Sequence, residues 1–262
     1  MTVVGVAGAT GAMGRAVLET AADRDDIAVA FAANRDPGED ERVAGQAVHD
    51  ATALPELLGE HSTEVIVDFT GPASAVEYAG ACAEAGVGFV TGTTGFDESG
   101  RTALHEAAES VPVLHATNFS RGIGALREAL SEIVAALPEY DVELTETHHH
   151  RKRDAPSGTA TTLLDGIDAA RGDSGESTAK RTYGREGEQQ REDGEIGVHV
   201  RRAGGVRGEH EVLLAGNDEV LTLAHRAESR AVFAAGALDT AGWLAGRAPG
   251  TYEFADVIEG ES

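Results

Sequence analysis

The stretch that decides the fold is VVGVAGATGAMG at residues 3–14. A short apolar run leads into a turn with glycines at positions 8, 11 and 14, and a helical pattern and a second apolar run at 27–33 follow. Strand, glycine turn, helix and strand in this order are typical of dinucleotide-binding units. Gly8 would permit the tight turn, Gly11 would let the backbone approach a pyrophosphate, and Gly14 would let helix pack on strand. A tight turn in an ordinary sheet protein is the plainer alternative.

Further apolar runs continue the alternation of strands and helices. Strands are predicted at 65–69, 87–91 and 111–115, and helices at 73–85 and 98–109. The expected fold is therefore α/β, with a Rossmann-type, doubly wound parallel sheet. Ligands of such sheets bind beyond the carboxyl ends of the strands. The loops that we expect to face a cofactor are DFTGP at 68–72, GTTGF at 92–96 and ATNFS at 116–120.

The end of the second predicted strand bears on the choice of nucleotide. An acidic side chain there accepts hydrogen bonds from a ribose 2′-hydroxyl, whereas an arginine accommodates a 2′-phosphate. This chain has the neutral Asn34 followed by Arg35. The pair favours NADPH and leaves NADH open, because high salt would weaken an exposed contact between arginine and phosphate.

From Tyr140 onward the pattern indicates a second, smaller α+β unit. Apolar and polar residues alternate, so that Glu146 and His148 continue the inward face of Val142 and His149 points the other way. Helices are predicted at 122–136, 159–170 and 229–245, strands at 196–203, 209–215 and 219–226, and a long exposed loop at 171–195. The core residues expected in the last helix are Val232, Phe233, Leu238 and Leu244, and an apolar tail at 252–258 closes the chain.

The most unusual stretch is THHHRKRDAPSGTA at residues 147–160. Three histidines, two arginines and a lysine are followed by a proline, a capping serine and small residues, which is how a helix begins. Side-chain cations and a helix N-terminus therefore come together, and they predict an anion site. Consecutive histidines on an extended chain point to alternate faces, so we expect no metal site here.

The charge of the chain limits its partners. Among 262 residues, 21 are Lys or Arg and 45 are Asp or Glu, which gives a formal net charge of −24. Only Lys152 and Lys180 are lysines. So acidic a surface argues against nucleic acid and anionic membranes as partners, and it favours a halophilic protein, since molar salt screens repulsion between carboxylates.

The sequence also predicts a cytoplasmic protein. Cys82 is the only cysteine, so the chain cannot form an internal disulfide, which is consistent with a reducing compartment. No apolar run approaches the length of a membrane span, and the first residues lack the features of a secretory signal.

Several separated motifs resemble those of the 4-hydroxy-tetrahydrodipicolinate reductase family of lysine and diaminopimelate biosynthesis. They are GATGAMG at 8–14, GTTGF at 92–96, NFS at 118–120, HHHRKRDAPSGTA at 148–160, GEH at 208–210 and AESRAVFAAGAL at 227–238. The resemblance implies NAD(P)H-dependent reduction of a small-molecule dicarboxylate. It implies a dinucleotide-binding domain at 1–121 and 231–262, and a substrate-binding domain at 122–230 whose mixed sheet builds a homotetramer.

The resemblance also implies roles for individual residues. His148 would be the acid/base, Lys152 the proton donor and His149 a substrate contact, while the amides of Gly158 and Thr159 would bind a substrate carboxylate. Beside Asn34, the residues expected at the cofactor are Gly8, Ala9, Thr10, Gly11, Ala12, Met13, Arg35, Gly92, Thr93, Thr94, Ala116, Thr117, Asn118 and Phe119.

Two other functions remain open at this point. One is a related NAD(P)-dependent amino-acid dehydrogenase, similar to aspartate dehydrogenase, and the other is a nucleotide-sensing protein that catalyses nothing. The motif at 148–159 favours the reductase, because a sensor needs no proton donor beside a dicarboxylate site. Crowding by neighbouring cations is expected to help Lys152 give up its proton. Glu209 and His210 are expected only to tie the small sheet together.

Overall fold

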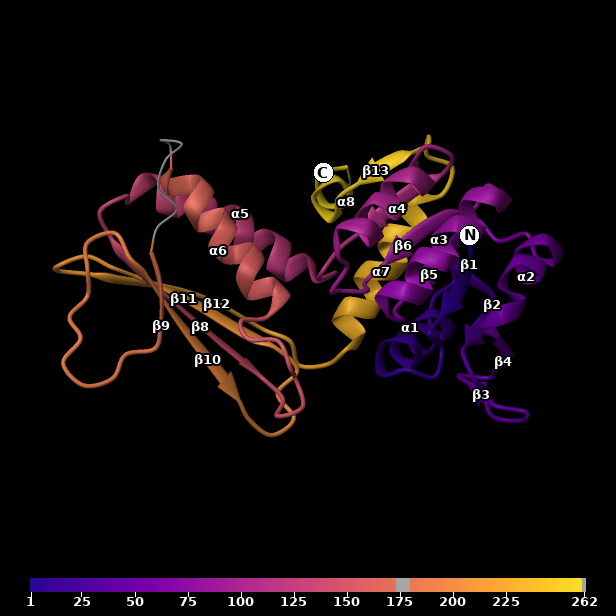
Figure 1. The fold of residues 1–262 in the computed structure, drawn as a ribbon, viewed down its shortest axis with the longest axis horizontal. Coiled ribbons are helices and arrows are strands. Elements are labelled where there is room, and N and C mark those ends of the chain that lie inside the picture. The colour runs from indigo at the N-terminus through magenta and orange to yellow at the C-terminus, as the bar shows by residue number, and fades with distance from the viewer. Residues whose placement is uncertain (173–179, 261–262) are drawn as a thin grey trace. The chain divides into compact units, whose positions relative to one another are not determined.

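The computed structural model describes residues 1–172 and 180–260, which form two compact units (Figure 1). The first unit contains 1–120 and 230–260, and the second contains 121–172 and 180–229. In neither of these described parts is any helix long and apolar enough to span a membrane.

The first unit is built on a sheet with the strand order β13-β7-β6-β5-β1-β2-β4-β3. Every neighbouring pair is parallel except β3 with β4, which is antiparallel. The strands are β1 (Thr2–Ala7), β2 (Ile27–Asn34), β3 (Arg42–Val43), β4 (Gln46–Asp50), β5 (Val65–Asp68), β6 (Gly88–Thr91), β7 (Pro112–His115) and β13 (Gly250–Tyr252). The sheet confirms the predicted Rossmann-type topology.

Helices cover both faces of this sheet because alternate strand residues point to opposite sides. Val65 and Val67 join one buried layer with α1 and α7, whereas Ile66 joins another with α2, α3 and α4. The helices are α1 (Ala12–Ala22), α2 (Leu54–Glu60) after a 3₁₀ turn at Ala51–Ala53, α3 (Pro72–Ala85), α4 (Glu98–Ala108), α7 (Ala231–Leu244) and α8 (Phe254–Glu259). The sheet is thus doubly wound, as predicted.

The glycine turn has the geometry that its spacing predicts. Gly8 has φ +81°, and a Cβ there would lie 2.7 Å from the Phe69 carbonyl oxygen. A Cβ on Gly14 would lie 2.1 Å from the Gly8 carbonyl oxygen. Gly8 is therefore required by both conformation and space, and Gly14 by the close packing of α1 on the turn.

The second unit is a mixed sheet with two helices on one face (Figure 1). Its strand order is β12-β11-β8-β10-β9, in which β8, β10 and β9 are parallel and β11 and β12 run antiparallel. The elements are α5 (Arg121–Ala136), β8 (Asp141–His148), α6 (Gly158–Arg171), β9 (Arg181–Tyr183), β10 (Ile196–Arg202), β11 (Glu209–Ala215) and β12 (Val220–Arg226). Val142 and Leu144 of β8 pack under both helices.

The predicted exposed loop at 171–195 is wrong for part of its length. Arg181–Tyr183 forms β9, which pairs with β10, and Glu195 is 2% exposed. Glu195 accepts hydrogen bonds from the Thr182 hydroxyl at 2.9 Å and from Arg185. Hydrogen bonds to the Glu195 carboxylate, and not contacts between aliphatic side chains, thus hold β9 and the residues after it in place. Residues 173–179 of the predicted loop lie outside the described residues.

Other elements differ from the prediction at the chain's later end and between β2 and β5. The tail forms β13 beside β7 and then α8, and residues 42–60 form β3, β4 and α2, none of which was predicted. Val232 is 37% exposed and is not a core residue. The buried face of α7 runs through Ala234, Leu238, Ala241 and Leu244, at the spacing of one helix stripe, so Leu238 and Leu244 are confirmed as core residues and Phe233 is half-buried.

Candidate active site

A pocket of about 520 Å³ opens at the ligand edge of the parallel sheet in the first unit. It is lined by the glycine turn, by the end of β2 and by the loop that connects β5 to α3. Its lining residues are Gly8, Thr10, Gly11, Asn34, Arg35, Asp36, Phe69, Thr70, Gly71, Pro72, Ala73, Ser74 and Tyr78. Five of the predicted cofactor residues are among them, namely Gly8, Thr10, Gly11, Asn34 and Arg35.

Arg35 joins two walls of this pocket. Its guanidinium donates a hydrogen bond to the Ser74 hydroxyl, in the first turn of α3. The side-chain amide of Asn34 donates to the Arg35 carbonyl oxygen at 2.8 Å. A cation and a helix N-terminus therefore line one pocket, which suits a phosphate.

A buried carboxylate supports the neighbouring loop. Asp68, at the end of β5, is fully buried and accepts hydrogen bonds from the hydroxyls of Thr70 at 2.6 Å, Thr91 at 2.7 Å and Thr93 at 2.8 Å. Burial raises the pKa of Asp68, and the three hydroxyls oppose that rise. The contacts hold the ends of β5 and β6 together, and so set the course of the loop that starts at Gly92.

The remaining predicted cofactor residues do not line the pocket. Ala9 and Phe119 are buried, and Phe119 packs on Phe69 and Phe254 with ring centroids 5.8 and 5.5 Å away. A contact between Phe119 and a ligand would therefore have to use its backbone. Among the other predicted residues, Thr93 and Ala116 are buried, Met13, Gly92 and Asn118 are half-buried, and Ala12, Thr94 and Thr117 are exposed.

In the second unit, the histidine cluster begins where β8 ends. His148 is the last strand residue, and a turn follows in which the Lys152 N–H donates to the His149 carbonyl oxygen at 3.0 Å. Ser157 then caps α6, because its hydroxyl oxygen accepts the Ala160 N–H at 3.2 Å. Gly158 and Thr159 are the first two residues of α6, where the N–H groups of a helix point out of its end.

Lys152 has a different neighbour from the one expected. Its ammonium forms an ion pair with Asp154 at 2.9 Å, so the predicted crowding by cations is replaced by contact with a carboxylate. Burial raises the pKa of Asp154, but the hydrogen bond and the charge of Lys152, together with smaller contributions that include the charge of Arg202, lower it overall.

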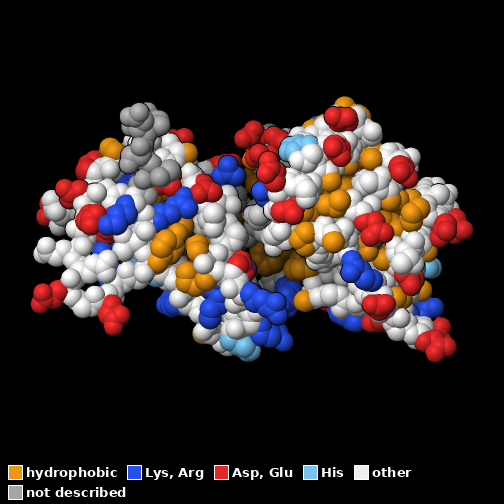
Figure 2. All heavy atoms as spheres, viewed as in Figure 1, with side chains coloured by type: hydrophobic (Ala, Val, Ile, Leu, Met, Phe, Trp, Pro, Cys, Tyr) orange, Lys and Arg blue, Asp and Glu red, His pale blue; other side chains and the backbone are white. Residues whose placement is uncertain are grey.

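The loops after β8 and β10 carry positive charge on an otherwise acidic chain. Figure 2 shows Lys and Arg side chains gathered over these loops, and Arg151, Arg153 and Arg207 are exposed there. The two loops contact each other, since both the backbone N–H and the ring Nδ1 of His150 bond to the Gly204 carbonyl oxygen, at 3.2 and 2.9 Å. The basic patch predicted from composition is therefore built from two segments far apart in sequence.

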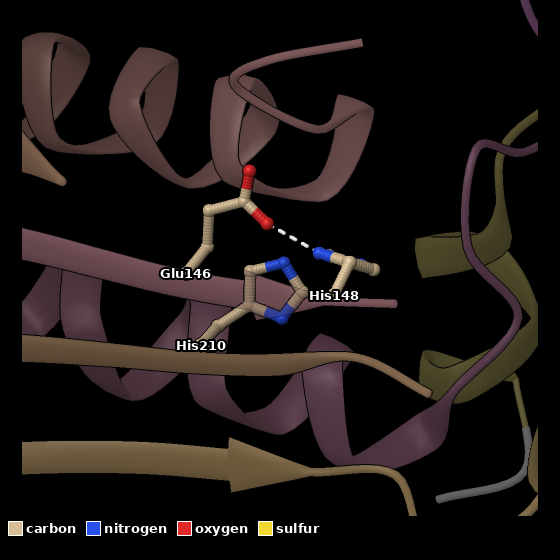
Figure 3. A group of neighbouring side chains, drawn as sticks. All are labelled: Glu146, His148 and His210. Carbon is tan, nitrogen blue, oxygen red and sulfur yellow. Dashed lines mark hydrogen bonds and ion pairs between the residues drawn. The ribbon is translucent and has the colours of Figure 1, made fainter. Parts of the chain in front are cut away.

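Three buried residues meet on the inward face of the mixed sheet. Figure 3 shows Glu146 and His148 of β8 pointing toward each other, with His210 of β11 beside them. The Nδ1 of His148 donates to Glu146 Oε2, and the rings of His148 and His210 stand edge to face with centroids 5.3 Å apart. Beneath α6, the Ser157 hydroxyl and His210 Nε2 are 3.2 Å apart.

The same carboxylate is bound from two further sides. Arg202, at the end of β10, donates to Glu146 Oε1 at 2.8 Å, and the Ser157 N–H donates to it at 3.1 Å. Donor atoms of Glu146, His148 and His210 lie within 4.8 Å of one another, as metal ligands would. A guanidinium already bound to that carboxylate would repel a divalent cation, so the cluster is suited to handling a proton and not to holding a metal.

Sequence reasoning missed several members of these sites. Alternation along β8 places Glu146 on the face of His148, but only the structure shows that they bond. Arg202 lies beside His148 because of the register between β8 and β10, and His210 also contacts Ser157 and the His148 ring. Asp68 ends β5 and Ser74 lies in the first turn of α3. The only sequence signal for these two residues was their position near a loop at the ligand edge of the sheet.

The chain is similar to known proteins over nearly its whole length. Residues 2–119 match the family described as dihydrodipicolinate reductase, N-terminus, and residues 122–258 match its C-terminus. A 4-hydroxy-tetrahydrodipicolinate reductase of Haloarcula marismortui is 54% identical over 259 residues, covering 99% of this chain and 100% of that one. One of Natronomonas pharaonis is 52% identical, covering 97% and 98%.

Solved structures agree in fold. A dipicolinate-bound dihydrodipicolinate reductase from Paenisporosarcina sp. TG-14 has a TM-score of 0.74 and 26% identity, and the match covers 97% of each chain. The DAP dehydrogenase of C. glutamicum in complex with DAP has a TM-score of 0.56 at 13% identity, covering 98% of this chain and 95% of that one, and this likeness concerns the fold alone.

Proposed function

The chain belongs to the dihydrodipicolinate reductase family, and we propose from this premise how its residues divide the reaction. Its function is the NAD(P)H-dependent reduction of 4-hydroxy-tetrahydrodipicolinate to tetrahydrodipicolinate in lysine biosynthesis. The observation that carries this conclusion is the match of both halves of the chain to the two halves of one family. No observation favours an amino-acid dehydrogenase or a sensor.

The first unit would bind the nicotinamide cofactor in the pocket at the ligand edge of its sheet. The turn at Gly8, Thr10 and Gly11 lines this pocket, and the first N–H groups of α1, at Ala12 and Met13, would bind a pyrophosphate. Arg35 would contact a 2′-phosphate, and position 34 carries the neutral Asn34 in place of the acidic side chain that would accept from a ribose 2′-hydroxyl. The pocket therefore supports NADPH over NADH, and the loops at 92–94 and 116–119 would carry the nicotinamide end.

The second unit would bind the dicarboxylate substrate at the basic patch. Gly158 and Thr159 would offer their amides to one carboxylate at the start of α6, where the helix dipole adds roughly 0.3 to 1 kcal/mol. His149 would be a further substrate contact. The structure of the Paenisporosarcina relative is described as dipicolinate-bound, which supports a planar dicarboxylate as the ligand class.

His148 and Lys152 would handle the proton. Hydride from the cofactor would reach C4 of the ring after the 4-hydroxyl has left, and the far end of the conjugated system would then be protonated. A positioned acid contributes roughly 10²- to 10⁴-fold in rate. Lys152, whose side-chain nitrogen lies 2.9 Å from Asp154, would donate this proton. His148 would supply or relay it through Nε2, the ring nitrogen that Glu146 leaves available.

The uncovered face of the mixed sheet would form a homotetramer. The helices α5 and α6 pack on one face only, and Val220 of the edge strand β12 is a large apolar residue exposed on the opposite face. A sheet face and edge of this kind favour association. Sedimentation of the wild type as four chains, and of Val220→Glu as a smaller species, would support this; a monomeric wild type would refute it. We further propose a cytoplasmic protein adapted to high salt.

The test is direct assay of the purified chain. Aspartate semialdehyde and pyruvate, condensed by the preceding enzyme, supply the substrate, and oxidation of NADPH and NADH is followed separately. We expect turnover with both and a higher kcat/KM with NADPH. When the same protein is given aspartate with NAD⁺ or NADP⁺, we expect no reduction of either nucleotide. Turnover with aspartate alone would overturn the assignment in favour of an amino-acid dehydrogenase.

A further inference from the structure

A fully buried carboxylate lies next to the proposed acid/base and has no role in the reaction described so far. Glu146 is 0% exposed and collects three donors, the His148 ring, the Arg202 guanidinium at 2.8 Å and the Ser157 N–H at 3.1 Å. Burial raises the pKa of Glu146, but the hydrogen bonds and the charges of His148 and Arg202 together outweigh burial and lower it to about 2. The three donors around Glu146 thus favour its anionic form.

This anion determines which nitrogen of His148 carries a proton. A carboxylate can only accept, so Nδ1 must be the N–H and Nε2 is the nitrogen that can exchange a proton. Gly208 passes close to that nitrogen, since a Cβ at position 208 would lie 3.2 Å from Nε2. The absence of a side chain there keeps space beside Nε2 for another group.

The second histidine of the cluster is kept neutral. Burial lowers the pKa of His210 to about 4, and the neighbouring His148 adds to the shift. The Ser157 oxygen already accepts the Ala160 N–H, so its own hydrogen is available for His210 Nε2 at 3.2 Å. His210 therefore does not compete with His148 for the charge of Glu146.

The other charged and titratable groups around Glu146 and His148 come from the strands and the turn packed on them. Arg202 comes from β10, His210 from β11, with His225 of β12 behind it, and Lys152 with Asp154 from the turn after β8. Glu146 is the member that contacts the His148 ring by a hydrogen bond. Glu146 thus accepts from the Nδ1–H of His148, while the Arg202 guanidinium, bound to the same carboxylate, disfavours transfer of that proton to Glu146.

We propose that Glu146 is a positioning residue, which holds His148 as the Nδ1–H tautomer and stabilises its protonated form through the Oε2 contact. The proton that is exchanged is the one on Nε2, and the Nδ1–H stays with Glu146 throughout. The inference rests on the proposed proton role of His148. It predicts that Glu146 matters for kcat only while His148 is present.

The first measurement concerns the wild-type protein and does not depend on activity. Nitrogen-15 NMR of the His148 ring in the full chain should show Nδ1 protonated at every pH and Nε2 titrating. A neutral ring protonated at Nε2 would overturn the proposal. In Glu146→Gln the fixed preference should be lost, whereas in Glu146→Asp it should be retained.

The second measurement is a double-mutant cycle on kcat with NADPH. Glu146→Gln should lower kcat by on the order of 10²-fold, with the KM for NADPH unchanged, and Glu146→Asp should restore part of it. In a His148→Ala background, Glu146→Gln should have no further effect. The matched control is Glu211→Gln, an exposed carboxylate on β11 that should keep the wild-type kcat.

The outcomes separate the two ideas. If Glu146→Gln lowers kcat equally with and without His148, Glu146 does not act through that ring and the positioning role fails alone. If His148→Ala keeps the wild-type kcat, the proton role of His148 fails and the positioning role fails with it. Should Glu146→Gln not fold, the tautomer in the wild type and the kcat of Glu146→Asp still decide the question.

Discussion

Arg35, the residue after β2, donates a hydrogen bond to the hydroxyl of Ser74 in the first turn of α3, 39 positions along the chain. Both residues line the pocket of the first unit. The bond holds the guanidinium beside the N-terminus of α3. A guanidinium and a helix N-terminus each attract a phosphate.

Arg35→Ala should raise the KM for NADPH by roughly 10- to 100-fold and leave that for NADH nearly unchanged. The reason is the loss of a charge-assisted hydrogen bond to the 2′-phosphate, worth about 1.5 to 3 kcal/mol. Ser74→Ala should act in the same direction but more weakly. Arg42→Ala removes the same charge from an exposed site on β3 and serves as the control. An equal rise in both KM values would show that Arg35 does not contact the 2′-phosphate.

Lys152→Ala should lower kcat by roughly 10²- to 10⁴-fold, because a proton donor is removed. The KM for NADPH should stay near the wild-type value, since Lys152 belongs to the other unit. Lys180→Ala is a matched control, because these are the two lysines of the chain and Lys180 is also ion-paired, with Glu192 at 2.8 Å. A Lys152→Ala enzyme with wild-type kcat would remove the proton-donor role.

Acid should destabilise the chain through His210. Its pKa is lowered to about 4 in the folded state from 6.5, so the unfolded chain binds one more proton between those values. Stability is then lost as the pH falls from about 6.5 to 4, by about 3 kcal/mol at most. We expect the free energy of unfolding in urea to fall less between pH 7 and pH 4.5 for His210→Gln than for the wild type. The exposed His49→Gln should retain the acid sensitivity of the wild type, and a His210→Gln chain as acid-sensitive as the wild type would contradict the prediction.

The melting temperature should rise with salt. A net charge of −24 is screened over about 10 Å at 0.1 M salt but over about 3 Å at 1 M. We expect Tm to be higher in molar KCl by roughly 10 °C, equivalent to a few kcal/mol for a chain of this size. Sucrose is the non-ionic control and should give a smaller rise. Full activity and an unchanged Tm in dilute buffer would refute adaptation to high salt.

The parts of the fold that the sequence predicts are those with strong local patterns. The apolar runs of β1, β5 and β6 are buried whichever strand lies beside them, so each could be recognised alone. β9 and β13 have three residues each, and their identity as strands depends on β10 and β7, which pair with them. Short strands of this kind carry no alternation long enough to detect.

The same distinction applies to the candidate site. Alternation from Val142 was enough to place Glu146 and His148 on one face. The contact of Arg202 with Glu146 depends on the parallel register that sets Arg202 beside His148, and that register arises from tertiary structure. Asp154, the ion-pair partner of Lys152, is part of the motif. The prediction for Lys152 considered only the neighbouring cations and so did not include this carboxylate.

The return of the chain to its first unit has a consequence for biosynthesis. α7 fills one buried layer of the parallel sheet, and β13 pairs with β7. During translation both elements leave the ribosome only after all of the second unit has been made. Until then one face of β1, β5 and β6 lacks the helix that covers it. The second unit can therefore fold on the ribosome while apolar surface of the first unit is still exposed.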